Sequence, residues 1–380
     1  MAIAFEIIGR TSGPVFMGEL AGALKLGQGV GIAESCLLTE AGWTLFSFDM
    51  EQSEAVFLDI GPATDLSFAP FSYQLQYDCA RRMVRLSFAD VILLAKQIPL
   101  GKPQVHLFNM GHCGSTLLHS VFNRIGAAWC LSEPMFVFDL AMARSTVDEA
   151  DRIALLRAGF AFLRLLPGLH PGQVQVIKHF SQAMTICWEC HCATPTAQCL
   201  YLYREPESWC NSIYGFVQRM GGRPMVVGRA ERAFQWWIMS GNTPSDWLDG
   251  LVDFASDVVT FDRMAAAAWA LHHELFFKAL AAGVPMLTTR YDRLVQDRAG
   301  AVARIFDHCG LVGEDLQPAL SAFDFDSHEG TATAKSVPVK RFTKTEFARI
   351  RAVLSSSQSP LNSRALWPDA RQHERNVGSA

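Results

Sequence analysis

The chain has 380 residues, 50% of them hydrophobic and 18% charged, so it is too apolar for general disorder and long enough for one large core or two smaller ones. Its 33 Lys and Arg against 37 Asp and Glu leave a net charge of −4, so no positive field over the whole surface would gather nucleic acid or anionic membrane, and any anion site must be local. The first residues lack a basic region, and no apolar run approaches the roughly 18 residues that span a bilayer. We therefore expect a cytoplasmic chain with no membrane span and no nucleic-acid partner.

Residues 1–100 are expected to form a small β-rich accessory module. Alternating stretches at 43–48 and 55–60, separated by Gly and Pro, have the pattern of strands. From 77 to 96 the apolar residues take helical spacing, which predicts a helix that leads out of the module. No motif in this module indicates its function.

Residues 101–380 are expected to form an α/β domain. Buried strand-like runs alternate there with helical segments, and these runs lie at 105–110, 127–131, 174–177, 200–203 and 285–289. This alternation predicts a parallel sheet flanked by helices on both faces. The stretch 216–263 is irregular and contains Trp236, Trp237 and Trp247. A substrate-covering insertion and a plain helical cap both fit that stretch.

The most informative segment joins the first of these strands to a helix through Gly111-His-Cys-Gly-Ser-Thr116. Such a turn aims several backbone N–H groups and the positive end of a helix dipole at one point, which favours a phosphate. Gly111 and Gly114 allow the anion to come close, and the hydroxyls of Ser115 and Thr116 can donate to its oxygens. An ordinary serine-capped turn is the alternative interpretation.

The loop differs from two common motifs. A Walker motif needs a lysine directly before its hydroxyl residue, but here Gly114 is followed by Ser115, and the loop contains no lysine. This argues against enzymes that use a magnesium nucleotide. The order of small residues also differs from the Gly-x-Ser-x-Gly elbow of serine hydrolases. The remaining interpretation is a phosphate site that needs no metal.

A second segment places an arginine at the end of a buried strand. Arg204 follows the run 200–203, Pro206 stands where a helix can begin, and Ser212 lies two turns into that helix. Arg204 and Ser212 could hold a second phosphate from two sides, because a guanidinium fork suits phosphate oxygens. A surface ion pair of Arg204 with Glu205 or Glu207 is the alternative.

Together these segments resemble the sulfotransferase superfamily, enzymes that use 3′-phosphoadenosine 5′-phosphosulfate (PAPS). Residues 111–118 resemble the family's 5′-phosphosulfate loop, and 202–212 are similar to its 3′-phosphate motif, an Arg with a Ser eight residues on. Residues 285–295 are similar to its Arg-Tyr-Glu-Asp-Leu-Val stretch. Residues 323–344 resemble the C-terminal segment that closes over the nucleotide. The four matches follow the order and spacing of the family over about residues 101–355.

The resemblance implies a P-loop-like α/β fold and transfer of a sulfuryl group from PAPS to a hydroxyl or amine acceptor, with no metal required. It also implies that the donor is bound by residues of these motifs: Gly111, His112, Cys113, Gly114, Ser115, Thr116, Leu117, Arg204, Ser212, Tyr291, Lys340 and Arg341. The sequence leaves the acceptor open, since a small molecule, a glycan, a peptide or a lipid would fit. It indicates no oligomeric state.

The loop departs from the family pattern at one position. The family usually has Lys or Arg where this chain has His112, so the positive charge that helps the 5′-phosphate leave could depend on pH or come from elsewhere. Lys178, which ends the strand 174–177, is a candidate source of that charge. A solvated lysine at a strand end is the alternative for Lys178.

Sulfuryl transfer also needs a base for the attacking O–H group, and two residues qualify. Glu133 follows the run 127–131, at the position where a Glu acts as base in the tyrosylprotein and several bacterial sulfotransferases that this chain resembles. His179 follows Lys178, whereas the cytosolic branch has its catalytic His one residue further along. Alternation along an extended segment would turn His179 away from Lys178, so we favour Glu133. A Glu that only caps the next helix is the alternative.

Two further alternatives concern function and metal. A non-catalytic nucleotide-binding scaffold of the same fold, inactive through His112, and a metal-independent phosphoryl or nucleotide transferase both fit the phosphate motifs. The cluster Cys187-Trp-Glu-Cys-His-Cys192 could supply half of a zinc site, but no second pair at similar spacing is found in the sequence. We expect these cysteines to pack as small apolar residues on a helix, and we predict no metal site.

Overall fold

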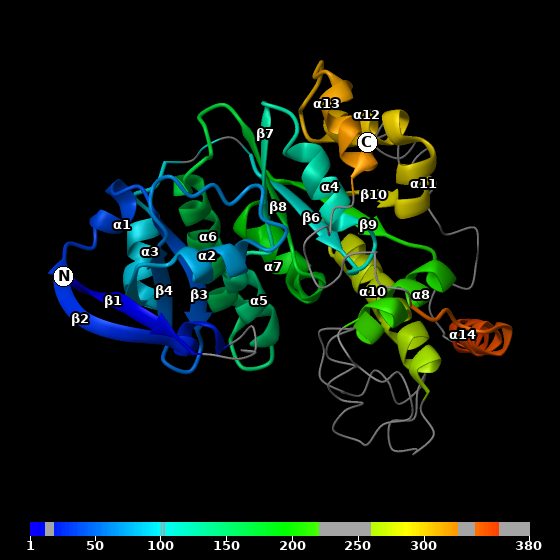
Figure 1. The fold of residues 1–380 in the computed structure, drawn as a ribbon, viewed down its shortest axis with the longest axis horizontal. Helices are drawn as coiled ribbons and strands as arrows, with labels where there is room; N and C mark the ends of the chain where they lie inside the picture. Colours follow the sequence, from blue (N-terminus) through cyan, green and yellow to red (C-terminus); the bar gives the residue numbers. More distant parts are fainter. Residues whose placement is uncertain (12–18, 100, 102, 220–259, 326–338, 357–380) are drawn as a thin grey trace. The chain divides into compact units, whose positions relative to one another are not determined.

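The computed structural model of the chain describes residues 1–11, 19–99, 101, 103–219, 260–325 and 339–356 (Figure 1). The fold divides into two compact units that alternate along the chain. The first unit comprises Met1–His106, Phe122–Gln198 and Cys309–Glu314, and the second comprises Leu107–Val121, Cys199–His308 and Asp315–Ala380. Trp236, Trp237 and Trp247, in the expected insertion 216–263, lie outside the described residues.

An antiparallel five-stranded sheet lies in the first unit, in the order β2-β1-β5-β4-β3 (Figure 1). Its strands are β1 (Ala2–Arg10), β2 (Leu24–Ile32), β3 (Trp43–Asp49), β4 (Glu54–Asp59) and β5 (Arg82–Ser87). The helices of this unit are α1 (Cys36–Thr39), α2 (Ser72–Cys79), α3 (Phe88–Ala95), α5 (Met135–Met142), α6 (Glu149–Phe162) and α7 (Cys187–Ala193). Short 3₁₀ turns lie at Ala21–Ala23, Leu163–Leu165 and Ser181–Ile186. Helix α3 packs against α6, and α5 packs against β3.

The helix predicted over residues 77–96 is wrong in its middle. Helix α2 ends at Cys79, β5 follows, and α3 begins only at Phe88. Strand β5 pairs with β1 on one side and with β4 on the other, where Met83 lies opposite Leu58. Hydrogen bonding on both edges and burial of its apolar residues stabilise the strand more than the local spacing favours a helix.

The second sheet is parallel, with the strand order β10-β9-β6-β8-β7. Its strands are β6 (Val105–Asn109), β7 (Ala128–Ser132), β8 (Val174–Lys178), β9 (Gln198–Tyr203) and β10 (Met286–Arg290). They coincide with the five predicted runs, so the predicted parallel α/β sheet flanked by helices is confirmed. Every residue of β6, β7 and β8 is buried, as expected for strands covered on both faces.

The remaining helices belong to the second unit. They are α4 (Ser115–Phe122), α8 (Pro206–Arg219), α10 (Phe261–Ala281), α11 (Tyr291–Gln296), α12 (Arg298–His308), α13 (Leu316–Leu320) and α14 (Lys344–Ser356), with a 3₁₀ turn at Ser321–Asp324. Helix α10 packs against α8 and α14, and its fully buried alanines let these helices approach closely. Of the helices described, none is both long and apolar enough to cross a membrane.

Candidate functional site

The loop between β6 and α4 has three residues in the left-handed region. The φ angles are 68° at Gly111, 47° at His112 and 90° at Gly114. Asn109 Oδ1 accepts from the Gly111 N–H at 2.8 Å, and Trp209 Nε1 donates to the Gly111 carbonyl at 2.8 Å. The chain therefore makes a fixed, tight turn directly before the first residue of α4. A turn of this kind directs successive N–H groups inward, which suits an anion.

The side chains that follow lie at the first turn of α4. Ser115 and Thr116 are both buried, at 7% and 6% exposure. Cys113 is fully buried, and its Sγ donates to the carbonyl of Leu202 at 3.2 Å. Leu117 lines the pocket described below. Cys113 thus ties the loop to β9, while the two hydroxyls remain at the helix N-terminus.

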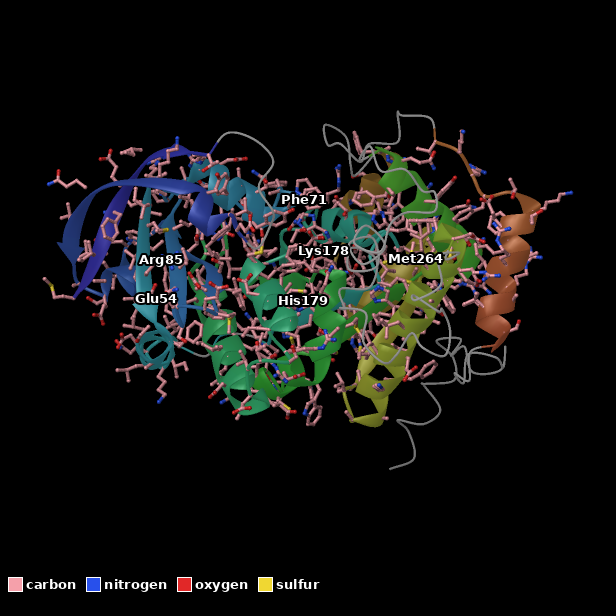
Figure 2. All side chains as sticks on the ribbon, turned by 90° about the horizontal axis from the view of Figure 1, so that it is seen from below. Glu54, Phe71, Arg85, Lys178, His179 and Met264 are labelled. Atoms are coloured by element: carbon pink, nitrogen blue, oxygen red, sulfur yellow. The ribbon has the colours of Figure 1, made fainter. Side chains whose placement is uncertain are left out.

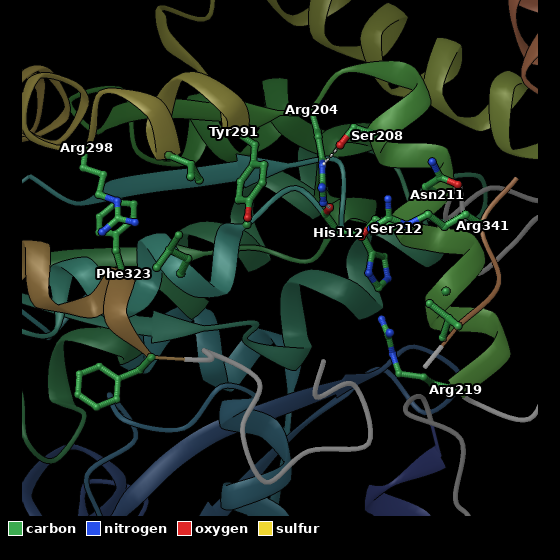
Figure 3. A pocket seen from close by; sticks show the side chains of 16 residues that line it. His112, Arg204, Ser208, Asn211, Ser212, Arg219, Tyr291, Arg298, Phe323 and Arg341 are labelled. Atoms are coloured by element: carbon green, nitrogen blue, oxygen red, sulfur yellow. Dashed lines mark hydrogen bonds between the residues drawn. The ribbon is translucent and has the colours of Figure 1, made fainter. Parts of the chain in front are cut away.

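Tyr291 packs between this loop and Arg204. A Cβ on Gly114 would lie 2.4 Å from the Tyr291 ring, so no larger residue fits there without movement of the ring. The guanidinium carbon of Arg204 lies 4.5 Å from the centre of the same ring, a cation–π contact (Figure 3). One aromatic side chain therefore sets both the loop and the arginine.

Replacing Gly114 by alanine is expected to destabilise the protein more than an ordinary left-handed glycine would. Gly283 is the matched control, because its φ is +93° and nothing lies within 4 Å of an added Cβ. Gly283→Ala should cost about 1–2 kcal/mol through the backbone alone. Gly114→Ala should cost about 1–3 kcal/mol more, because Tyr291 must shift. Denaturant unfolding measures both, and equal losses would show that the contact with Tyr291 is unimportant.

Arg204 is held by two further contacts. Its Nε donates to Ser208 Oγ at 2.7 Å, and its Nη1 donates to the carbonyl of His112 at 3.3 Å (Figure 3). Burial lowers the pKa of Arg204 from its ordinary value, although the guanidinium stays charged at neutral pH. A partly buried arginine held in this way has little freedom to lose when it binds an anion.

The alternative of a surface pair for Arg204 does not occur. Glu205 instead forms an ion pair with Arg290 at 2.6 Å, and Glu207 forms one with Arg351 at 2.7 Å. Among the described residues, no carboxylate lies within ion-pair distance of Arg204. Its charge is therefore directed to the pocket.

The pocket beside the loop has a volume of about 520 Å³ and lies within the second unit (Figure 3). Sixteen described residues line it, and none of them is Asp or Glu. The basic lining residues are His112, Arg204, Arg219, Arg298 and Arg341. Its polar and aromatic lining residues are Ser208, Asn211, Ser212, Tyr291, Phe323 and Phe325. A cavity with four arginines and no carboxylate favours a ligand that carries several negative charges.

A C-terminal segment is fastened along α8. The Gln218 side-chain amide donates to the carbonyl of Lys340 at 3.0 Å and accepts from its N–H at 2.9 Å. Asn211 Oδ1 accepts from the N–H of Phe342 at 3.0 Å. These contacts place Arg341 at the pocket, whereas Lys340 is not among the lining residues. Residues 326–338, within the predicted closing segment, lie outside the described residues.

Most of the residues of α8 that line the pocket were not predicted from the sequence. Ser208, Ser212, Gly215 and Arg219 recur at intervals of three or four residues and all line the pocket. Such spacing puts them on one face of the helix. A stripe of small and polar residues opposite the apolar face of α8 could therefore have indicated its pocket-lining face. Arg298 had no such signal.

In the first unit, the buried Lys178 forms an ion pair with the partly buried Glu133. Lys178 Nζ donates to Glu133 Oε1 at 2.7 Å and to Ser132 Oγ at 3.0 Å. The side chain of Lys178 is 1% exposed and that of Glu133 is 15% exposed. Ser132 and Lys178 are register partners on β7 and β8, which brings the two side chains together. Glu133 has φ of +60°, an uncommon conformation for a residue other than glycine.

His179 points into a different environment. It is fully buried, and its Nε2 lies 2.8 Å from His106 Nδ1. Because the Thr194 hydroxyl donates to the carbonyl of Cys190, it accepts from His106 Nε2, so His106 Nδ1 accepts from His179. Burial and the neighbouring His106 hold the pKa of His179 well below its usual value. Its partners are thus structural, unlike the carboxylate that Lys178 contacts.

The two buried histidines should make the protein less stable in acid. Burial, with a smaller contribution from His191, lowers the pKa of His106 to about 3. The unfolded chain therefore binds more protons below about pH 6.5, and stability falls as pH drops toward 3. We expect His179→Gln to flatten this fall by up to ~1.4 kcal/mol per pH unit. Denaturant unfolding between pH 7 and 5 measures it, and an unchanged slope would contradict it.

The cysteine cluster forms helix α7. Cys187 and Cys190 are buried on this helix, and Cys192 is partly exposed. Among the described residues, no group of three or more His, Cys, Asp or Glu could hold a metal. Helical packing of the cluster matches the expectation for small apolar residues.

No model of a protein family matches the chain, and no curated protein does. A sulfotransferase from Alicyclobacillus acidocaldarius is 12% identical, with 70% of this chain and 100% of that chain covered and a TM-score of 0.38. A mouse sulfotransferase complexed with 3′-phosphoadenosine 5′-phosphate (PAP) is 12% identical over 77% of this chain and 96% of that chain, with a TM-score of 0.39. A sulfotransferase from Mycobacterium avium is 12% identical over 73% of this chain and 83% of that chain, with a TM-score of 0.40. At this level of similarity, the functional proposal rests on the site itself.

Proposed function

We propose that the chain is a sulfotransferase that moves a sulfuryl group from PAPS to a hydroxyl or amine acceptor. The observation that carries the proposal is the pocket at the N-terminus of α4, with four arginines, His112 and no carboxylate among its described lining residues. Its volume of about 520 Å³ is in the range of cofactor sites. A nucleotide with phosphates at two positions needs such spread-out positive charge.

The residues fit that donor in three parts. The N–H groups of residues 112–116, with the hydroxyls of Ser115 and Thr116, would bind the 5′-phosphosulfate. Arg204, Ser212 and Arg341 would bind the 3′-phosphate. The aromatic lining residues would offer faces to the adenine ring. The bound donor supplies the activated sulfuryl group.

The proposed reaction uses Glu133 as the base, as in the tyrosylprotein and bacterial branch. The Glu133 carboxylate takes the proton of the acceptor O–H while the acceptor oxygen bonds to sulfur. The bond from sulfur to the 5′-phosphate oxygen breaks, and that oxygen keeps the electron pair. Lys178 orients the carboxylate through its 2.7 Å contact. The loop N–H groups and His112 would stabilise the leaving phosphate, and Lys178 is the proposed second source of positive charge for the reaction.

Calorimetry with 3′-phosphoadenosine 5′-phosphate (PAP) tests the donor site. We expect binding in the micromolar range or tighter. The affinity should be the same when a metal chelator is present, because the loop has no Walker lysine and the positive charge of the pocket comes from its lining side chains. If the chelator abolishes binding, the site belongs to a metal-dependent nucleotide enzyme.

Mass spectrometry tests the reaction. The protein and PAPS are incubated with a metabolite extract, and products heavier by one sulfuryl group are sought. We expect such products to form together with PAP. Tight binding of PAP without turnover on any extract would assign the chain to the non-catalytic scaffolds.

A further inference from the structure

A segment of the N-terminal module contacts the Glu133–Lys178 pair. Pro70, Phe71, Ser72 and Tyr73 lead into and begin helix α2, and they belong to the same compact unit as the pair. No sulfotransferase motif identified in the sequence includes them. Their contacts give this module a role next to the reacting groups.

Two hydrogen bonds fasten the segment to Ser132. The Ser72 hydroxyl donates to the carbonyl of Ser132, and the Ser132 hydroxyl donates to the carbonyl of Pro70 at 2.6 Å. Both serines are fully buried. Since the Ser132 hydroxyl donates to Pro70, its lone pair is left to accept from Lys178 Nζ at 3.0 Å. The segment thereby sets the direction of the hydroxyl that holds the lysine.

Two aromatic rings of the segment border the same pair. Lys178 Nζ lies 5.9 Å from the centre of the Phe71 ring, within cation–π range (Figure 2). Burial and, to a smaller extent, the charge of Glu133 raise the pKa of the Tyr73 hydroxyl above its ordinary value. The Tyr73 ring also packs against Phe180 at 5.6 Å. The ammonium therefore meets a carboxylate, a hydroxyl and an aromatic face.

We propose that residues 70–73 are a positioning clasp for Lys178 and Glu133, and that the clasp acts through Ser132. A lysine has a flexible four-carbon stem and three N–H donors, so one carboxylate does not fix its position. Ser132 supplies the second fixed acceptor. The bond from Ser72 holds the backbone directly before Glu133, whose left-handed conformation needs such support. The catalytic consequence of this inference rests on the proposed function.

The first test is a double-mutant cycle on turnover. Ser132→Ala should lower kcat by about 10- to 100-fold, because a small displacement of a reacting group has an effect of this size, and PAP affinity should be unchanged. In a Lys178→Met background, Ser132→Ala should have no further effect, because the residue acts through the lysine. Ser47→Ala, a buried serine of β3, is the control and should keep normal kcat. Additive losses would overturn the proposal.

The second test does not need turnover. An amine-directed acylating reagent is applied, and mass spectrometry follows the modification of Lys178 against Lys278, whose side chain is 56% exposed. Ser72→Ala and Ser132→Ala should each raise the rate at which Lys178 is modified about tenfold or more relative to wild type, while the rate at Lys278 stays as in wild type. The control variant Ser47→Ala should keep the unfolding midpoint of the wild type. Unchanged Lys178 rates would overturn the clasp. Absence of turnover in the wild type would instead refute only the proposed function.

Discussion

Replacing Arg204 by alanine is expected to raise the Kd for PAP by about 10- to 150-fold, the loss of a charge-assisted phosphate contact of ~1.5–3 kcal/mol. The large effect is expected because Arg204 is already ordered by Ser208, Tyr291 and the loop carbonyl of His112. Its neighbours Glu205 and Glu207 are engaged elsewhere, so no carboxylate competes with the ligand. Calorimetry on the purified variant measures the change.

One variant separates the fork of Arg204 from its charge, and a second, at another arginine, serves as the control. Arg204→Lys should recover only part of the affinity, because an ammonium lacks the two parallel donors of a guanidinium. Arg293→Ala, on the exposed side of α11, should bind PAP as wild type does. The wild type should also prefer PAPS over adenosine 5′-phosphosulfate, and Arg204→Ala should lose that preference. Equal affinities of the wild type for these two nucleotides would contradict the assignment of the 3′-phosphate.

The sequence was most informative where function depends on local chemistry. The loop at 111–116 could be recognised because two glycines, two hydroxyl residues and the start of a helix are consecutive in the chain. The same holds for Arg204 at the end of β9, followed by Pro206 at the first residue of α8. In each case one turn of the backbone fixes the geometry, so the residue order contains the information.

Contacts between distant segments were not predictable in this way. Gln218 binds the backbone of Lys340 across 122 residues, and nothing in either segment indicates the other as its partner. The clasp from Ser72 to Ser132 spans 60 residues and depends on how the N-terminal module packs in its unit. Strand β5 was missed for a related reason, because pairing with β1 and β4 decided its conformation.

Replacing Glu133 by glutamine is expected to lower kcat by about 10²–10⁴-fold and to leave PAP binding almost unchanged. Glutamine keeps the size and the hydrogen bonding to Lys178 but cannot accept the proton of the acceptor. PAP binding should persist because every described lining residue of the arginine pocket belongs to the second unit, whereas Glu133 belongs to the first. Glu149→Gln, an exposed residue of α6, is the matched control and should keep full turnover.

His179 is the rival base, and the same assay decides between the two. His179 is fully buried, its Nε2 is engaged with His106, and burial disfavours its protonated form, which a general base must adopt during the reaction. We therefore expect His179→Gln to lose stability while the folded fraction keeps a kcat within about tenfold of wild type, far from the loss of a base. If Glu133→Gln turns over normally and folded His179→Gln does not, His179 is the base, and the ion pair of Glu133 with Lys178 serves only to hold β7 against β8.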